Sequence, residues 1–247
     1  MKLMGIVNVT PDSFSDGGKF FDSSLAIEHA LKLVEDGADI IDVGGESTRP
    51  GALSVSVDEE LQRVIPVIEG IRKKSDIPIS IDTTKSIVAK HSIDAGASMI
   101  NDISSGRFDS EMFSVAATTN VPISLMHMQG MPQTMQINPR YENIISEIHE
   151  FLSDAISRAT QSGIEKKNII IDPGIGFGKT PEDNVEIIKH LDKFLDLDCP
   201  ILIGTSKKSF IGKLLGLEVN KRLPATLATL AVSVEKGAKI LRVHDVA

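Results

Sequence analysis

The stretch SLAIEHALKLVEDGADIIDV, residues 24–43, contains a complete helix-to-strand unit. Its first part repeats apolar residues at the three-to-four-residue spacing of an amphipathic helix. Its last part, ADIIDV at 38–43, is a short apolar run typical of a parallel strand buried on both faces. Gly37 separates the two, and glycine can end a helix in the left-handed conformation without a Cβ penalty. The stretch therefore predicts a helix that ends at a glycine and leads into a buried strand.

The same unit recurs along the chain. Gly96 and Gly237 stand at equivalent junctions, and further helix-period segments cover 57–74 and 141–163. The short apolar runs predicted as strands are 3–9, 38–43, 77–82, 98–103, 121–126, 168–173, 200–204 and 239–243. Eight strand–helix units fit a (β/α)8 barrel, whereas a doubly wound sheet usually has fewer strands and an early glycine-rich dinucleotide motif.

The predicted fold class is therefore α/β, a (β/α)8 TIM barrel, with residues 1–247 as a single domain. Only residues 244–247 follow the last predicted strand. We therefore expect the eighth helix to be missing at the C-terminus.

Composition narrows the class of protein. With 41% hydrophobic and 24% charged residues, the chain is typical of soluble globular proteins. A formal net charge of −8 without a long basic run argues against nucleic acid or an anionic membrane as the partner. The single cysteine, Cys199, excludes an intrachain disulfide, and no apolar run approaches the ~18 residues of a membrane span. We expect a cytoplasmic protein that acts on small molecules.

Polar residues stand where nearly every predicted strand ends. They are Asn8, Asp42, Asp82, Asn101, Asp102, His127, Asp172, Ser206, Lys208, Arg242 and His244. Catalytic groups of such barrels lie at the C-terminal ends of the strands, so these side chains should meet at one mouth. Any one Asp, Asn or Ser could simply cap a helix or turn. We interpret Asp42 and Asp102 as residues that pair with a nearby cation or cap a loop. Capping does not require the Lys, Arg and His residues at neighbouring strand ends.

Glycine-rich loops leave the same face at 13–20, 44–52 and 172–183. The sequence GIGFGK in the third loop matches neither a P-loop nor a dinucleotide motif, so we expect a hinge or ligand cover rather than a nucleotide site. After the seventh strand, a helix is predicted to start near Ser206 or Lys207. Its positive N-terminal end, together with Lys208 and Arg242, predicts an anion site.

Eight motifs carry a resemblance to a known family. They are MGIVNVTPDSFSDGG (4–18), DVGGESTRPG (42–51), SIDT (80–83), NDIS (101–104), LMHMQG (125–130), DPGIGFGK (172–179), SKKSFIG (206–212) and RVHDV (242–246). In this order they closely resemble the dihydropteroate synthases, the folate-pathway enzymes targeted by sulfonamides. The resemblance covers nearly the whole chain.

The resemblance implies a transferase of folate biosynthesis. Such an enzyme condenses 6-hydroxymethyl-7,8-dihydropterin diphosphate with 4-aminobenzoate, giving 7,8-dihydropteroate and diphosphate with the help of Mg²⁺. No protein nucleophile is required, because diphosphate is a good leaving group once its charge is neutralised. The resemblance also implies a homodimer whose interface draws on the late helices.

The family's functional residues map onto positions of this chain. The resemblance implies that Asp82, Asp172 and Lys208 are catalytic, and that Asp82, Asn101, Asp172 and Lys208 pair with the pterin ring between the apolar walls Met126 and Phe177. Thr48 and Arg49 are expected on a loop that closes over the reacting ends, and Ser206 where the aminobenzoate carboxylate binds. Arg242 and His244 are expected to bind diphosphate, with Asn8 at the metal and diphosphate end. One departure is Lys207, where the family usually has Arg.

Two alternatives remain open at this point. A pterin-binding methyltransferase domain on the same barrel would have no diphosphate to expel, and so little use for Lys208, Arg242 and His244 beside a metal site. An inactive barrel that serves as a binding module would show the loss of a site residue. In this chain the only such change is Lys207.

Overall fold

The computed structural model describes residues 1–10, 23–48 and 51–247. Its strands are β1 (Lys2–Asn8), β2 (Ile40–Gly44), β3 (Ile79–Asp82), β4 (Met99–Asp102), β5 (Ile123–Met126), β6 (Ile169–Asp172), β7 (Leu202–Ile203) and β8 (Ile240–Val243). All paired strands are parallel, and β1 lies between β2 and β8. A single bridge between Ile171 and Ile201 joins β6 to β7 and closes the ring. The predicted eight-stranded barrel is confirmed.

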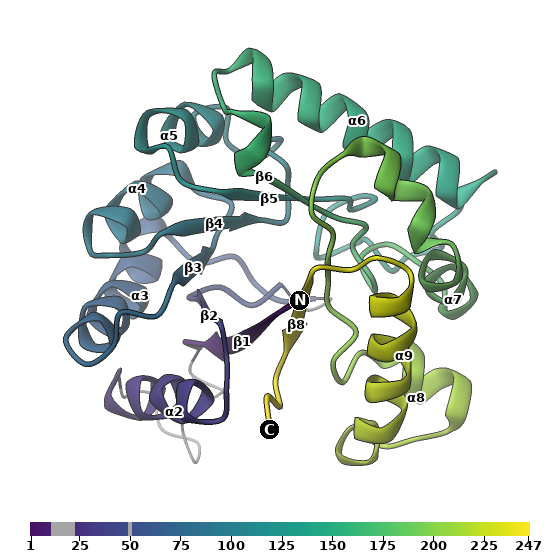
Figure 1. Cartoon of the computed structure of the whole chain (residues 1–247), viewed down its shortest axis with the longest axis horizontal. Coiled ribbons are helices and arrows are strands. Elements are labelled where there is room, and N and C mark those ends of the chain that lie inside the picture. The colour runs from purple at the N-terminus through teal and green to yellow at the C-terminus, as the bar shows by residue number, and fades with distance from the viewer. Residues whose placement is uncertain (11–22, 49–50) are drawn as a thin grey trace.

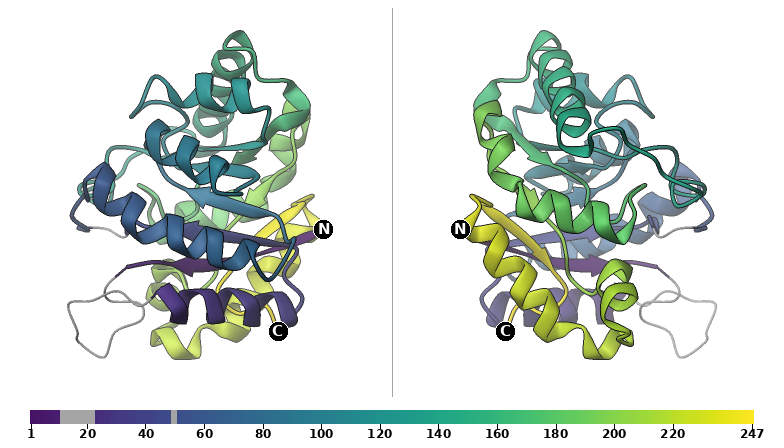
Figure 2. Two further views of the ribbon diagram at one scale, coloured as in Figure 1. Left: turned by 90° about the vertical axis from the view of Figure 1, so that its left-hand side faces the viewer. Right: turned by 90° about the vertical axis from the view of Figure 1, so that its right-hand side faces the viewer.

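Helices surround the strands on the outside (Figure 1). They are α2 (Ser23–Glu35), α3 (Val57–Arg72), α4 (Ser86–Asp94), α5 (Met112–Thr119), α6 (Ile144–Gln161), α7 (Pro181–Lys189), α8 (Ser209–Leu215) and α9 (Leu223–Glu235), with short 3₁₀ turns η1 (Lys166–Asn168), η2 (Leu191–Leu197) and η3 (Val219–Lys221). Side views show the helices running alongside the strands (Figure 2). No helix in the described ranges is long and apolar enough to cross a membrane.

The three glycine junctions have the predicted geometry. Gly37, Gly96 and Gly237 have φ values of 102°, 116° and 103°, in the region that L side chains rarely adopt. Each follows a helix and precedes a strand, so one local device ends α2, α4 and α9.

The helix after β7 starts later than predicted. It begins at Ser209 rather than near Ser206 or Lys207. Lys207 has a φ of 58°, and Lys208 is extended with a ψ of 150°, so neither residue can belong to a helix. Residues 204–208 therefore connect the end of β7 to the start of α8, and Lys208 lies at the mouth of the barrel.

The interior of the barrel explains why the polar strand ends meet. Six buried apolar residues from six strands form a separate cluster: Met4, Ile40, Met99, Ile170, Leu202 and Ile240. Neighbouring residues of a strand point to opposite faces, so residues two positions further on point the same way. Those residues are Ile6, Asp42, Asn101, Asp172, Gly204 and Arg242. The apolar cluster is thus the floor of a polar mouth.

Candidate active site

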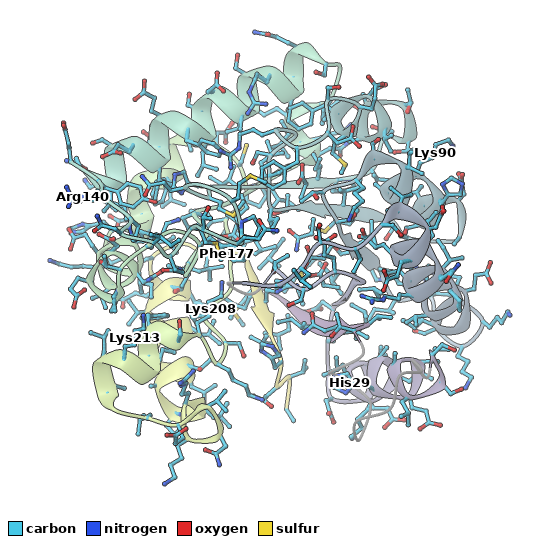
Figure 3. The ribbon with its side chains drawn as sticks, turned by 180° about the vertical axis from the view of Figure 1, so that it is seen from behind. His29, Lys90, Arg140, Phe177, Lys208 and Lys213 are labelled. Atoms are coloured by element: carbon cyan, nitrogen blue, oxygen red, sulfur yellow. The ribbon has the colours of Figure 1, made fainter. Side chains whose placement is uncertain are left out.

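A hollow at the C-terminal ends of the strands gathers most of the predicted binding residues. From the predicted set, its walls contain Thr48, Asp82, Asn101, Met126, Asp172, Phe177, Ser206, Lys208, Arg242 and His244. Phe177 and Lys208 lie together near the middle of this face, whereas Lys90 and Arg140 lie towards its rim (Figure 3). Arg49 lies outside the described residues. Asn8 ends β1 and is partly exposed, but it is not part of this wall.

Three wall residues were not predicted: Ile6, Ile103 and Gly204. Strand alternation could have found them, because Ile103 stands two residues after Asn101 and Ile6 two residues before Asn8. An adjoining hollow of about 270 Å³ shares Thr48, Asp82 and Ile103 with the first. The mouth is therefore a double hollow with Asp82 at the junction.

Arg242 forms the central ion pair of the site. Its Nε donates to Asp42 Oδ2 at 2.6 Å, and its Nη2 donates to Asp82 Oδ2 at 2.7 Å. Asn101 Nδ2 also donates to Asp42 Oδ2, at 3.2 Å. The interpretation of Asp42 as the partner of a nearby cation is confirmed. Arg242, predicted only as a ligand of diphosphate, also holds two strand-end carboxylates together.

Asp102 has the capping role that the sequence indicated. It is fully buried, and its carboxylate accepts from Ser104 N, Ser104 Oγ and Gly106 N at 2.6–2.8 Å. These bonds fix the loop after β4, and the side chain is not part of the wall.

Negative charge is in excess around Asp82. The pKa of Asp82 is raised to about 7, mainly by burial; the carboxylates of Asp42, Glu60 and Asp102 act in the same direction, while Arg242 opposes them. Burial likewise raises the pKa of Asp172. We attribute the raised pKa of Asp82 first to its burial and then to the neighbouring carboxylates, which outnumber the single guanidinium of Arg242.

The raised pKa predicts that the ionised carboxylate of Asp82 destabilises the folded protein. Because its folded-state pKa lies above the usual value of 3.8, the folded protein binds this proton more tightly than the unfolded chain does. The free energy of unfolding should therefore fall as the pH rises from about 4 to about 7. Asp82→Asn removes this cost, so we expect its melting temperature at pH 8 to exceed that of the unmodified protein by about 2–4 °C.

Thermal denaturation followed by circular dichroism at pH 5 and pH 8 measures this effect. The gain should be smaller at pH 5, where Asp82 is mostly protonated. A melting temperature that falls at pH 8 more than at pH 5 would show that the bond to Arg242 outweighs the cost of the buried charge.

Ser206 joins the ends of β7 and β8. Its hydroxyl oxygen lies 3.2 Å from the backbone N of His244, which donates to it, and 3.0 Å from His244 Nδ1. A hydroxyl has one proton, so accepting from the backbone leaves it able to donate to Nδ1. This pair places His244 and Ser206 on the same side of the mouth.

Lys208 lies across the hollow. Its Nζ donates to the carbonyl oxygen of Ile175 and stands 4.3 Å from the centre of the Phe177 ring. Burial lowers the pKa of Lys208 to about 8, with Arg242 acting in the same direction and Asp172 against it. The neighbouring Lys207 instead pairs with Asp245 at 2.8 Å and is not part of the wall.

Two glycines of the loop at 172–183 lie close to the backbone that follows β5. A Cβ on Gly174, at a φ of 73°, would stand 1.9 Å from the carbonyl oxygen of His127. A Cβ on Gly178 would stand 2.5 Å from the carbonyl oxygen of Gln129. The two glycines serve close backbone packing, and the loop brings Phe177 to the wall of the hollow. The loop at 13–20 lies outside the described residues.

Gly174→Ala should therefore be strongly destabilising. The added methyl group meets a backbone oxygen that cannot rotate away, and the positive φ adds strain of its own. We expect the free energy of unfolding to fall by about 3 kcal/mol or more. Urea denaturation measures this, with Gly51→Ala as the control, because Gly51 also has a positive φ but open space around it. Equal losses in the two variants would contradict the packing argument.

A second charged group fixes the base of the loop at 44–52. Lys85 Nζ donates to the carboxylates of Glu46 and Glu60, and Arg63 donates to the carbonyl oxygen of Gly45 at 2.7 Å. Sequence reasoning missed this group, because its members are far apart along the chain and each looks like an ordinary surface charge. It sets the position from which the chain continues to Thr48.

The described residues contain no cluster of three or more His, Cys, Asp or Glu side chains that could hold a metal ion. Asn8 brings one neutral oxygen ligand. A Mg²⁺ ion usually keeps few protein ligands and completes its shell with substrate phosphates and water. Asn8 therefore fits a metal held mainly by a bound diphosphate.

A (β/α)8 barrel with carboxylates, an amide and two partly buried cations at its C-terminal mouth defines a barrel enzyme with a polar ligand site. A family model described as "Pterin binding enzyme" matches residues 4–244. The chain is 49% identical to the dihydropteroate synthase of Synechocystis sp. over 245 residues, covering 99% of this chain and 85% of that one. It is 49% identical to the Bacillus subtilis dihydropteroate synthase over 244 residues, covering 99% and 83%.

Solved structures of dihydropteroate synthases have the same fold as this chain. Xanthomonas albilineans dihydropteroate synthase with 4-aminobenzoic acid matches with a TM-score of 0.94 and 46% identity, covering 100% of this chain and 88% of that one. The Yersinia pestis enzyme in a sulfonamide complex matches with a TM-score of 0.94 and 43% identity, covering 99% and 89%. The chain belongs to the pterin binding enzyme family and, within it, to the dihydropteroate synthases. It is an enzyme, a transferase, as the sequence predicted.

Proposed function

We propose that this enzyme joins 6-hydroxymethyl-7,8-dihydropterin diphosphate to 4-aminobenzoate, giving 7,8-dihydropteroate and diphosphate. The observation that carries the proposal is the convergence of Asp82, Asn101 and Asp172 with Lys208 and Arg242 on one hollow. A dihydropteroate synthase solved in complex with 7,8-dihydropteroate has the same fold, with a TM-score of 0.89 and 42% identity. The methyltransferase and inactive-barrel alternatives gain no support from these comparisons.

The pterin ring is recognised by acceptors at the floor of the hollow. Asp172 gives one carboxylate oxygen to Gly174 N, and Asn101 gives its amide N–H to Asp42, so each keeps an acceptor for the ring. Ring N–H donors would favour the ionised form of Asp172, whose pKa burial has raised. Met126 and Phe177 would cover the faces of the ring.

The diphosphate lies, in this proposal, against Arg242 and His244. Two of the five guanidinium N–H groups of Arg242 are directed to Asp42 and Asp82, so others can donate to phosphate oxygens without breaking these bonds. Arg242 would then bind the leaving group and hold the ring-binding Asp82 at the same time. Asn8 would supply an oxygen ligand to Mg²⁺, which when bound would neutralise charge on the departing diphosphate.

The bond between the pterin methylene carbon and the diphosphate oxygen breaks, and the aromatic amine bonds to the same carbon. The amine then releases a proton to solvent. As diphosphate leaves, positive charge develops on the methylene, and the carboxylates of Asp82 and Asp172 would stabilise it electrostatically. Lys208 would hold the ring edge, while Ser206 would receive the aminobenzoate carboxylate and Thr48 and Arg49 would cover the reacting ends.

A coupled assay of diphosphate release tests the function. The protein is given the pterin diphosphate with Mg²⁺, with and without 4-aminobenzoate. We expect release that depends on 4-aminobenzoate and is lost when the metal is chelated. Release at the same rate without the amine would indicate a hydrolase instead.

We further propose that the enzyme is a cytoplasmic homodimer that uses its late helices. Four leucines on α8 and α9 are 40–57% exposed: Leu214, Leu215, Leu223 and Leu227. Exposed leucines on two successive helices would suit a subunit contact. Light scattering that gives the mass of one chain would contradict the dimer.

A further inference from the structure

The segment Ile175–Gly178 carries Phe177 and is held by side chains at every carbonyl. Gln136 Nε2 donates to Gly176 O at 2.5 Å, Lys179 Nζ to Phe177 O at 3.0 Å, Tyr141 OH to Gly178 O at 2.7 Å, and Lys208 Nζ to Ile175 O. These donors come from three separate parts of the chain: the β5–α6 connection, the glycine-rich loop itself and the start of α8. Four successive carbonyls are thus fixed, although the segment has no regular secondary structure.

Lys179 is the donor that the function does not yet explain. It is 2% exposed, and its three N–H groups meet three acceptors: Phe177 O, His127 Nδ1 at 2.9 Å and His127 O at 3.4 Å. None of these acceptors is a carboxylate. Burying an ammonium group costs free energy. The burial of Lys179, with all three of its donors paired, therefore needs an explanation other than solubility or surface charge.

His127 provides two of the three hydrogen-bond acceptors of Lys179. Burial and the charge of Lys179 hold the pKa of His127 far below its usual value, so its ring stays neutral and Nδ1 can accept. Its backbone N–H donates to the carbonyl oxygen of Asp172 at 2.9 Å. Phe151 packs edge-on against the ring at 4.9 Å between centroids. Lys179 therefore ties the Phe177 backbone to the ends of both β5 and β6.

Lys179 also acts on Asp172 by charge. The charges of Lys208, Lys179 and Arg242 lower the pKa of Asp172 against the effect of burial. The charged groups that act on Lys179 are Asp172, Lys208 and Asp183, and His127 is the titratable group in contact with it. Burial lowers the pKa of Lys179 to about 7, so it bears its charge on the acid side of neutrality.

We propose that Lys179 is a positioning residue of the pterin pocket, which fixes the backbone that carries Phe177 to the ends of β5 and β6 and places its positive charge near the ring-binding Asp172. This inference rests on the proposed function, since the ligand is the pterin diphosphate. Lys179 is not part of the pocket wall, so it acts through Phe177 and Asp172.

Lys179→Met tests the proposal, because it keeps most of the side-chain volume and removes the charge and the donors. We expect the dissociation constant of the pterin diphosphate, measured by calorimetry, to rise about tenfold or more. Without the nearby cation the pKa of Asp172 should rise, so the loss of binding on acidification should begin at a pH about 0.5 higher or more. Lys90→Met, the same change at an exposed site on α4, should alter neither quantity.

Tyr141→Phe tests the fixing of residues 175–178 separately from the charge of Lys179. It removes one hydrogen bond to Gly178 O and no charge, so it should weaken binding about two- to tenfold and leave the pH dependence in place. Wild-type affinity in Lys179→Met, or weaker binding with an unmoved acid limb, would overturn the proposal. If Lys179→Met does not fold, unchanged affinity in Tyr141→Phe overturns it. Absence of binding by the unmodified protein would instead refute the proposed function.

Discussion

Asp172→Asn is expected to weaken binding of the pterin diphosphate about 100-fold or more while leaving the fold intact. The variant loses the charge of a buried acceptor in the wall of the hollow where we propose that the ring binds, and hydrogen bonds to charged groups contribute ~1.5–3 kcal/mol each. The side chain still accepts from Gly174 N through its remaining oxygen, so the loop after β6 should keep its position.

Calorimetry with the pterin diphosphate measures the loss, and circular dichroism checks the fold. Asp154→Asn is the matched control, because Asp154 lies on the outer helix α6 with its side chain 66% exposed. Near-normal affinity in Asp172→Asn would show that the ring does not pair with this residue.

Arg242→Ala is expected to damage stability and ligand binding together. It leaves the buried carboxylates of Asp42 and Asp82 without their shared cation, and breaking a buried pair costs ~3–5 kcal/mol. For a chain of this size that corresponds to a fall in melting temperature of about 6 °C or more. The variant should also lose more affinity for the pterin diphosphate than for the same pterin without diphosphate.

The double variant Arg242→Ala with Asp42→Asn separates the two effects. It removes one of the stranded charges, so stability should recover in part, whereas affinity for the diphosphate should not. Equal losses of affinity for the two pterins would mean that Arg242 acts on the fold alone. A melting temperature unchanged in Arg242→Ala would contradict the ion-pair account.

The sequence predicted the site well where strand geometry decides it. Asp82 and Asp172 end their strands, Asn101 and Arg242 stand one residue before the end, and parallel strands in a closed barrel bring such ends to one mouth. The position of a strand end is a local property of the sequence, and so it could be predicted.

What the sequence could not predict depends on long-range contacts. Arg242 and Asp42 are 200 residues apart, and nothing in either motif shows that they pair. Lys179 follows a glycine-rich loop, where a lysine would ordinarily be taken for an exposed residue. Its burial depends on the packing of Gly174 and Gly178 against the backbone of residues 127–129. The late start of α8 follows from the left-handed conformation of Lys207, which its residue type does not favour.

The most direct test of the central claim is mass spectrometry of the product formed from the pterin diphosphate and ¹³C-ring-labelled 4-aminobenzoate. The proposed function predicts 7,8-dihydropteroate that carries the whole labelled ring, in a one-to-one ratio with released diphosphate, and no product with Asp172→Asn. Diphosphate released without a labelled product, or no reaction by the folded, Mg²⁺-supplied protein, would contradict it.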